Sequence, residues 1–182
     1  AFNWQAGREN VVIPWAIGGV PVTAIGGLAF QTSGIVSVIA PQTVTSIGDG
    51  AFINCISLAS VLLPQATAIG GYAFRSCGSL TSASLPQAHT VGDGAFSDCF
   101  LLASINLPQV ASIGDTAFFY CSSLTSINLP QATSIGDYAF SDCSSLTAVR
   151  MGQNAPAEAT DVFYGITPPP TVYVTDPQAT GW

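Results

Sequence analysis

Apolar and polar residues alternate along this chain in a pattern that returns at a fixed interval. The dipeptide Ala-Phe recurs six times, from Ala29-Phe30 to Ala139-Phe140, with 22 residues between successive copies. An apolar residue followed by glycine keeps the same interval, four residues upstream, from Ile25-Gly26 to Ile135-Gly136. A fixed period of this length is typical of a solenoid, in which each unit buries its apolar face only by stacking on its neighbours. The pattern therefore predicts a stack of similar coils.

Within one unit the spacing predicts a strand, a turn and a second extended segment. The unit at 124–145 begins with a strand whose inward side chains are apolar and whose outward ones are polar, since successive strand residues point to opposite sides. Pro130 then turns the chain, because proline cannot continue a central strand. Residues 132–135 are extended, and Asp137 is placed to cap a helical turn over 138–143. Coils of this kind stack about 4.8 Å apart.

The repeat divides the chain into three parts. Residues 1–18 lie outside the strict repeat and are predicted to form an N-terminal cap, while residues 19–151 carry the repeats. Residues 152–182 are predicted to form a degenerate last repeat, with an outer turn at 161–165, and a C-terminal cap with a strand at 171–175. A cap has to shield the open end of the stacked core, which takes apolar area. The aromatic residues expected to do so at the N-terminal end are Phe2, Trp4 and Trp15.

The unit L-x-S-I-x-L-P followed by S-I-G-D-x-A-F-x-x-C resembles the BspA-type leucine-rich repeats of bacterial surface proteins. The resemblance covers about residues 11–182. It implies a right-handed leucine-rich-repeat coil of about six to seven 22-residue units, with short parallel strands on one face, helical turns and loops on the other, and caps at both ends. Two departures from the family pattern are Thr175, where proline is common, and the absence of lysine.

Composition narrows the possible partners. Only 7% of the residues are charged, against roughly one quarter in an average soluble domain, so short polar side chains must keep the surface wet. The net charge is −7, with three arginines and no lysine, which argues against binding to nucleic acid or to an anionic membrane surface. No run approaches the ~18 apolar residues of a membrane span. The first residue, Ala1, suits either a mature form left by signal-peptide cleavage or an excised domain.

The cysteines follow the repeat, one to a coil. Their odd number rules out complete pairing within one chain, and a single ligand type in a row does not make a tetrahedral metal site. A disulfide between neighbouring coils is within reach by distance, but the parallel Cβ directions oppose it. A ladder of buried free thiols acting as small apolar residues is therefore preferred to a metal or disulfide interpretation. The residues concerned are Cys55, Cys77, Cys99, Cys121 and Cys143.

Acidic residues form another column, which raises the question of calcium. Each Asp follows glycine at a position suited to capping, and no D-x-D-x-D spacing is present, so capping is the preferred interpretation. His89 is the single histidine and is read as an exposed substitution. Without a nucleophile beside a base, the sequence predicts no enzyme, cofactor or metal site. The acidic residues are Asp49, Asp93, Asp115 and Asp137, with Asp98 and Asp142 nearby.

The outward strand positions are the candidate partner-binding surface. They form two columns, one made of serine and the other apolar at its N-terminal end and polar beyond Leu62. An exposed Ile-Leu pair on a regular sheet is a reasonable contact for a protein or a glycan, although the polar residues can equally serve only to solvate the sheet. The first column is Ser37, Ser60, Ser82, Ser104 and Ser126, and the second is Ile39, Leu62, Ser84, Asn106 and Asn128.

Two functions remain open at this point. The resemblance implies a secreted or cell-surface adhesion module of bacterial type, which presents its strand face to a protein or glycan partner. The alternative is a structural protein that assembles end to end into multimers or filaments. Strand edges at the two ends of a solenoid are unpaired, and a chain with few charges is poorly protected against such pairing.

Overall fold

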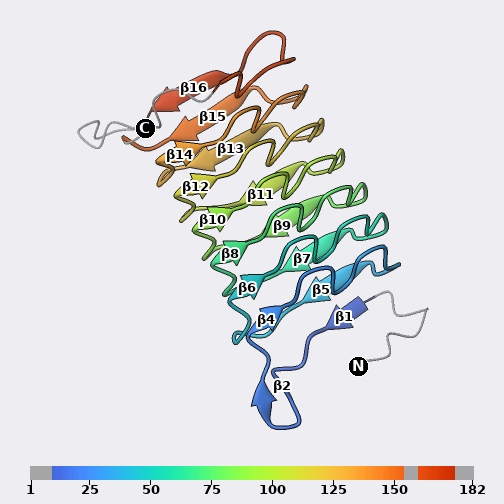
Figure 1. Cartoon of the computed structure of the whole chain (residues 1–182). Helices are drawn as coiled ribbons and strands as arrows, with labels where there is room; N and C mark the ends of the chain where they lie inside the picture. The colour runs from blue at the N-terminus through green and yellow to red at the C-terminus, as the bar shows by residue number, and fades with distance from the viewer. Residues whose placement is uncertain (1–9, 154–159, 175–182) are drawn as a thin grey trace.

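The protein is a stack of coils, each of which contributes a strand to one or both of two parallel sheets (Figure 1). The computed structural model describes residues 10–153 and 160–174. The first sheet runs in the order β1-β5-β7-β9-β11, and β13, β15 and β16 follow it along the stack. These strands are β1 (Asn10–Val12), β5 (Ser37–Ile39), β7 (Ser60–Leu62), β9 (Ser82–Ser84), β11 (Ser104–Asn106), β13 (Ser126–Leu129), β15 (Ala148–Met151) and β16 (Thr171–Val174).

The second sheet is made of two-residue strands on another side of the coils. Its order is β14-β12-β10-β8-β6-β4, so neighbours in the sheet are successive coils in the chain. We call the segment that leads from a strand of this sheet to the next strand of the first sheet an outer turn. The strands are β4 (Ala24–Ile25), β6 (Ser46–Ile47), β8 (Ala68–Ile69), β10 (Thr90–Val91), β12 (Ser112–Ile113) and β14 (Ser134–Ile135).

The register of both sheets follows the sequence repeat. Ser60 pairs with Ser82 in the first sheet and Ile113 with Ile135 in the second, so residues one period apart lie side by side. Parallel pairing of this kind leaves each strand buried between two neighbours in the hydrogen-bonding direction, except at the ends of the stack. The predicted strand, turn and extended segment of each unit are confirmed.

The core is built from columns of identical side chains, as the repeat predicts. Phe30 is 6% exposed and every later phenylalanine of the Ala-Phe column is fully buried. Neighbouring rings in this column lie nearly parallel, with centroids 5.0 to 5.3 Å apart from Phe30 to Phe140. Phe163 continues the column at 5.9 Å from Phe140, so the predicted degenerate repeat at 161–165 is confirmed.

The outer turns are not helical, which corrects the prediction made for 138–143. No helix is present in the described residues. The N–H groups of Phe140 and Asp142 donate to carbonyl oxygens of the next coil at 2.9 and 2.8 Å, whereas the N–H of Ser141 donates to Tyr138 within the turn at 3.0 Å. Tyr138 and Asp142 have φ values of 55° and 57°, which a right-handed helix does not tolerate. Alternate N–H groups therefore join the coils, where a helix would keep them inside one turn.

One position of the outer turn alternates between a large side chain and none. Leu28, Gly50, Tyr72 and Gly94 follow one another there in successive coils, with φ values of 58°, 60°, 56° and 58°. A Cβ atom on Gly50 would lie 2.7 Å from Cδ2 of Leu28, and one on Gly94 would lie 2.5 Å from Cε1 of Tyr72. Glycine therefore gives room to the side chain of the preceding coil, besides adopting the left-handed φ without strain.

The two ends of the described stack differ. At the N-terminal end β1 joins the first sheet, and β2 (Ala16–Ile17) and β3 (Val20–Pro21) form an antiparallel hairpin beneath the stack (Figure 1). Trp15 is 66% exposed, so the prediction that it shields the core is wrong, and Phe2 and Trp4 lie outside the described residues. An apolar hollow of about 200 Å³ lies under Ile25 and Phe30. At the other end β16 confirms the predicted closing strand.

Candidate binding surface

The candidate residues all lie on the outward side of the first sheet, which we call the strand face. Both columns are exposed or half-buried along their whole length, while the side chains between them point into the core. The reason is the two-residue alternation of a strand, which places one set of residues outward in every coil. The structure thus brings together Ser37, Ser60, Ser82, Ser104 and Ser126 with Ile39, Leu62, Ser84, Asn106 and Asn128.

The apolar end of the strand face is larger than the sequence repeat indicates. Val12 pairs with Ile39, which pairs with Leu62, so three apolar side chains stand in one row on β1, β5 and β7. Their exposed fractions are 69%, 45% and 44%. A search at the 22-residue period misses Val12, because the step from β1 to β5 is 27 residues long and contains the hairpin. The signal that would have found it is the apolar run Val11-Val12-Ile13.

The opposite end of the strand face is cationic and aromatic. Arg150 on β15 and Tyr173 on β16 continue the row that begins at Val12, and the guanidinium carbon of Arg150 lies 5.8 Å from the centre of the Tyr173 ring. Sequence reasoning missed both residues because they fall beyond the well-kept repeats. The strand face therefore changes along its length from apolar, through serine and asparagine, to one positive charge.

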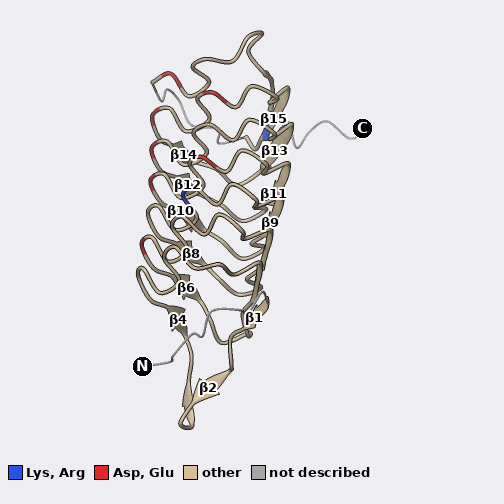
Figure 2. Ribbon diagram, turned by 90° about the vertical axis from the view of Figure 1, so that its right-hand side faces the viewer, with Lys and Arg blue, Asp and Glu red and all other residues tan. Residues whose placement is uncertain are grey.

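Negative charge is kept away from the strand face. Every described Asp lies in an outer turn, and Figure 2 shows these residues on the far side of the coils from the wall formed by β9, β11, β13 and β15. The described carboxylates are Asp49, Asp93, Asp98, Asp115, Asp137, Asp142 and Asp161. Because like charges repel, this separation favours neutral or anionic partners on the strand face and disfavours them on the outer turns.

The acidic column ties one coil to the next, which corrects the expectation of a local helix cap. Oδ1 of Asp93 accepts the backbone N–H of Asp115 at 3.0 Å, and Oδ1 of Asp115 accepts that of Asp137 at 2.9 Å. Asp137 does the same for Thr160 at 2.8 Å. The carboxylates therefore satisfy donors of the following coil, and hydrogen bonds to a charged acceptor are stronger than those between neutral groups.

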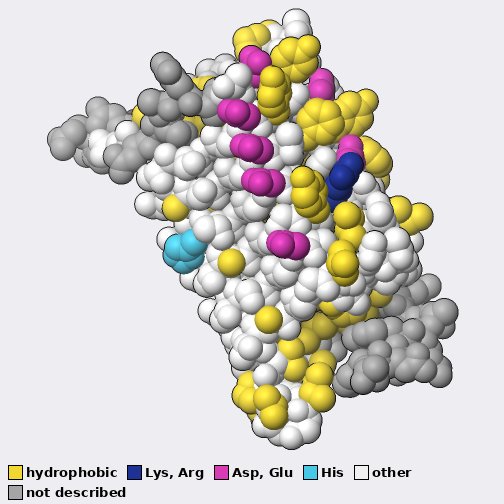
Figure 3. Space-filling model, in the orientation of Figure 1, with side chains coloured by type: hydrophobic (Ala, Val, Ile, Leu, Met, Phe, Trp, Pro, Cys, Tyr) yellow, Lys and Arg dark blue, Asp and Glu magenta, His cyan; other side chains and the backbone are white. Residues whose placement is uncertain are grey.

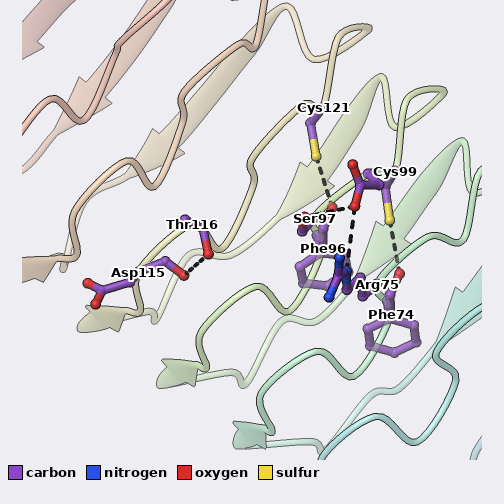
Figure 4. Close-up of polar contacts among 9 residues, drawn as sticks. Phe74, Arg75, Phe96, Ser97, Cys99, Asp115, Thr116 and Cys121 are labelled. Atoms are coloured by element: carbon purple, nitrogen blue, oxygen red, sulfur yellow. Dashed lines mark hydrogen bonds and ion pairs between the residues drawn. The ribbon is translucent and has the colours of Figure 1, made fainter.

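The cysteine column has a hydrogen-bonding role that the sequence does not reveal. Each Sγ donates to the carbonyl oxygen of the Phe in the preceding coil, 25 residues earlier, at 2.9 to 3.2 Å (Figure 4 shows Cys99 with Phe74 and Cys121 with Phe96). All five cysteines are buried and free. The expected ladder of unpaired thiols is confirmed. In the first coil Ser33 takes the place of cysteine, 22 residues before Cys55.

Thiol labelling is expected to distinguish the folded from the unfolded chain. Burial raises the pKa of Cys77 and Cys121 well above the usual thiol value and that of Cys99 to about 12, so at pH 8 these residues stay as unreactive thiols. Labelling of the native protein should therefore be slow, and denaturation without reductant should release five reactive thiols. Fewer than five would reveal disulfides or a bound metal.

The remaining sequence candidates add no further chemistry. His89 is exposed, as expected, and its Nδ1 lies 2.8 Å from the carbonyl oxygen of Gln87. Within residues 10–153 and 160–174, no three His, Cys, Asp or Glu side chains are grouped as they would be around a metal ion. The same residues contain no helix long and apolar enough to cross a membrane.

Fold and surface together define the class of the protein. A stack of parallel-strand coils with a regular, neutral outward sheet and no acidic residue on it is a repeat solenoid of the leucine-rich kind. The family model for the BspA type leucine rich repeat region matches six copies over residues 23–147 and 89–168. The chain belongs to the BspA-type leucine-rich repeat family.

Solved structures of bacterial proteins share this fold. A leucine rich cell surface protein of Faecalibacterium prausnitzii A2-165 is 30% identical over 82% of this chain, which spans 48% of that protein's chain, with a TM-score of 0.57. The leucine-rich repeat protein TpLRR of T. pallidum is 28% identical, with 84% of this chain and 72% of that chain covered and a TM-score of 0.54.

A third structure supports the fold alone. A leucine-rich repeat protein of Bacteroides ovatus ATCC 8483 is 20% identical over 92% of this chain and 54% of its own, with a TM-score of 0.63. The chain thus spans about half the length of the F. prausnitzii and B. ovatus proteins. No curated protein sequence matches it.

Proposed function

We propose that this chain is a binding module of a secreted or cell-surface bacterial protein, which attaches to a protein or glycan partner through its strand face. Membership of the BspA-type family supports a role at a surface, and the F. prausnitzii relative is itself called a cell surface protein. The observation that carries the proposal is the exposed row of Val12, Ile39 and Leu62 on an otherwise polar sheet. Exposed apolar groups aligned on a rigid surface mark contact sites.

The physical advantage of this surface is that it is already ordered. Its backbone is held by parallel pairing on both sides and its inward side chains are buried, so little conformational entropy is lost when a partner docks. Covering an apolar side chain such as Ile39 or Leu62 contributes up to ~1.5–3 kcal/mol. Serine and asparagine in the later coils supply hydrogen-bonding groups beside this apolar end.

Replacing Ile39 and Leu62 together by Asn is expected to abolish adhesion while leaving folding intact. Asparagine already occupies this position at Asn106 and Asn128, so the strands tolerate it. Binding of the purified chain to immobilised extracellular matrix proteins and to a glycan array measures adhesion, and thermal unfolding measures folding. The matched control is Ile56→Asn with Leu101→Asn, which removes exposed apolar side chains from the outer turns. Unchanged binding by the strand-face variant would exclude the strand face as the contact surface.

A second candidate function is end-to-end assembly. The outer edge of β16 carries three exposed apolar or aromatic residues, Val172, Tyr173 and Val174, and the apolar hollow lies at the opposite end of the described stack. Strand edges and apolar ends of this kind pair with other chains when nothing covers them. In this case the Ile39 and Leu62 variant assembles normally, and Val172→Lys with Val174→Lys breaks multimers into monomers. Light scattering and electron microscopy of the purified chain separate the two functions.

A further inference from the structure

The outer turns contain a cation site that the chain fills with its own arginine. Arg75 lies with its guanidinium carbon 5.7 Å from the centre of the Tyr72 ring, and its Nε atom is 3.6 Å from Oδ2 of Asp98 in the next coil. Figure 4 shows Arg75 turned toward this carboxylate beside Ser97, whose Oγ donates to the same oxygen at 3.1 Å. An aromatic face and a carboxylate from adjacent coils are thus the elements that hold a guanidinium here.

The same elements recur three coils later, without the arginine. Tyr138 occupies the repeat position of Tyr72, and Asp142 that of Asp98, 44 residues further on, with the same serine hydroxyl bond from Ser141 at 3.3 Å. The residue at the repeat position of Arg75 is Ser141, a short and buried side chain. The described part of the chain supplies no cation to this place, since Arg150 lies on the strand face.

A second ring and more carboxylates complete the arrangement. Tyr164, 61% exposed, meets Tyr138 at right angles, with ring centres 6.2 Å apart and planes at 76°. The Tyr138 hydroxyl donates to Oδ2 of Asp161 at 3.3 Å, and the Asp142 carboxylate packs against Gly165. Two electron-rich rings at an angle, flanked by carboxylates, form an environment that attracts a cation from two sides.

The negative potential at these rings has a measurable sign. Asp161, followed by partial desolvation and then Asp137, raises the pKa of Tyr138 above its ordinary value, because neighbouring negative charges oppose formation of the phenolate. Figure 3 shows the surrounding surface, where acidic and apolar side chains lie together toward the C-terminal coils. Net charge across the chain is −7, so the field extends beyond a single contact.

We propose that Tyr138 and Tyr164, with Asp137, Asp142 and Asp161, form a recognition site for an arginine side chain of a partner protein. The partner fills the place that Arg75 fills in its own coil, with its guanidinium against the rings and its N–H groups on the carboxylates. The site lies on the outer turns, away from the strand face, and is independent of the function proposed for that face. A partner with exposed arginines fits this acidic side of the solenoid by charge as well as by shape.

The proposal is tested with a capped arginine–glycine peptide and the same peptide with citrulline in place of arginine. Citrulline keeps the planar shape and removes the charge. Binding is measured by isothermal titration at low and high salt. The arginine peptide should bind and weaken with salt, and Tyr164→Leu should reduce its affinity about two- to fivefold, the usual range for an exposed cation–π contact. Asp161→Asn should reduce the affinity further and flatten the salt dependence.

Matched variants separate a site from general attraction to an acidic chain. Tyr173→Leu removes a tyrosine of similar type from the strand face, and Asp49→Asn removes the same charge from an N-terminal coil while leaving an oxygen to accept the N–H of Gly71. Both should bind the arginine peptide like the parent. Equal binding of the citrulline peptide, equal losses in the control variants, or no binding by the parent chain would each overturn the proposal. Thermal unfolding of every variant confirms that the exposed side chains were removed without loss of the fold.

Discussion

Replacing Phe118 by Ala is expected to lower the free energy of unfolding by about 3–5 kcal/mol, which is the range for deletion of a buried aromatic side chain. Phe118 is fully buried and its ring stacks between those of Phe96 and Phe140, at 5.3 and 5.2 Å. Removal leaves a gap in the middle of a continuous column, and the rigid coils on each side cannot close it. Urea unfolding followed by circular dichroism measures the effect.

Phe100→Ala is the matched control for this substitution. Phe100 is 43% exposed and contacts Tyr120 at the surface, so its loss should cost much less. A cost below about 1 kcal/mol for Phe118→Ala would contradict its placement inside the core. It would also reverse the assignment of inner and outer residues throughout the stack.

Gly92→Ala is expected to destabilise the protein by about 1–3 kcal/mol or more, although it adds a single methyl group. A Cβ atom at Gly92 would lie 2.7 Å from the backbone nitrogen of Gly71 and 2.8 Å from the carbonyl carbon of Gly70. Backbone atoms cannot rotate away as a side chain can. The two coils must therefore separate locally, which stretches the 2.9 Å hydrogen bond from Gly92 to Ile69.

The first coil provides the control for this effect. Gly26 is the equivalent residue there, with no described coil beneath it, and a Cβ atom built on it meets nothing within 4 Å. Gly26→Ala should leave the unfolding midpoint in urea near that of the parent. Equal destabilisation by the two substitutions would show that backbone conformation, and not contact between coils, requires glycine at this position.

The inward columns could be predicted from the sequence because packing leaves them no freedom. A ring stacked at about 5 Å on the same ring of the next coil admits only phenylalanine-like shapes, so Phe74 and its equivalents recur without drift. The two outward columns follow from the same register by alternation. The sequence therefore places Ser60 and Leu62 correctly without any knowledge of the coordinates.

The outer turns could not be predicted in the same way. The left-handed φ of Tyr120 and Asp142 is imposed by hydrogen bonds to the next coil, and neither residue announces it locally. A sequence of Asp, an aromatic residue and Ala reads as a capped helical turn when only local preferences are weighed. The contacts of Asp137 likewise depend on Thr160, 23 residues away, and no local spacing reveals such a partner.

The alternation of Leu28, Gly50, Tyr72 and Gly94 gives this part of the solenoid a doubled period. Each bulky side chain occupies the space that a Cβ atom of the following coil would need, so coils with and without a side chain must take turns there. Gain or loss of a single coil in this region would set two bulky residues, or two glycines, next to each other. The length of the molecule is thus expected to change by pairs of coils, through duplication or deletion of 44-residue units.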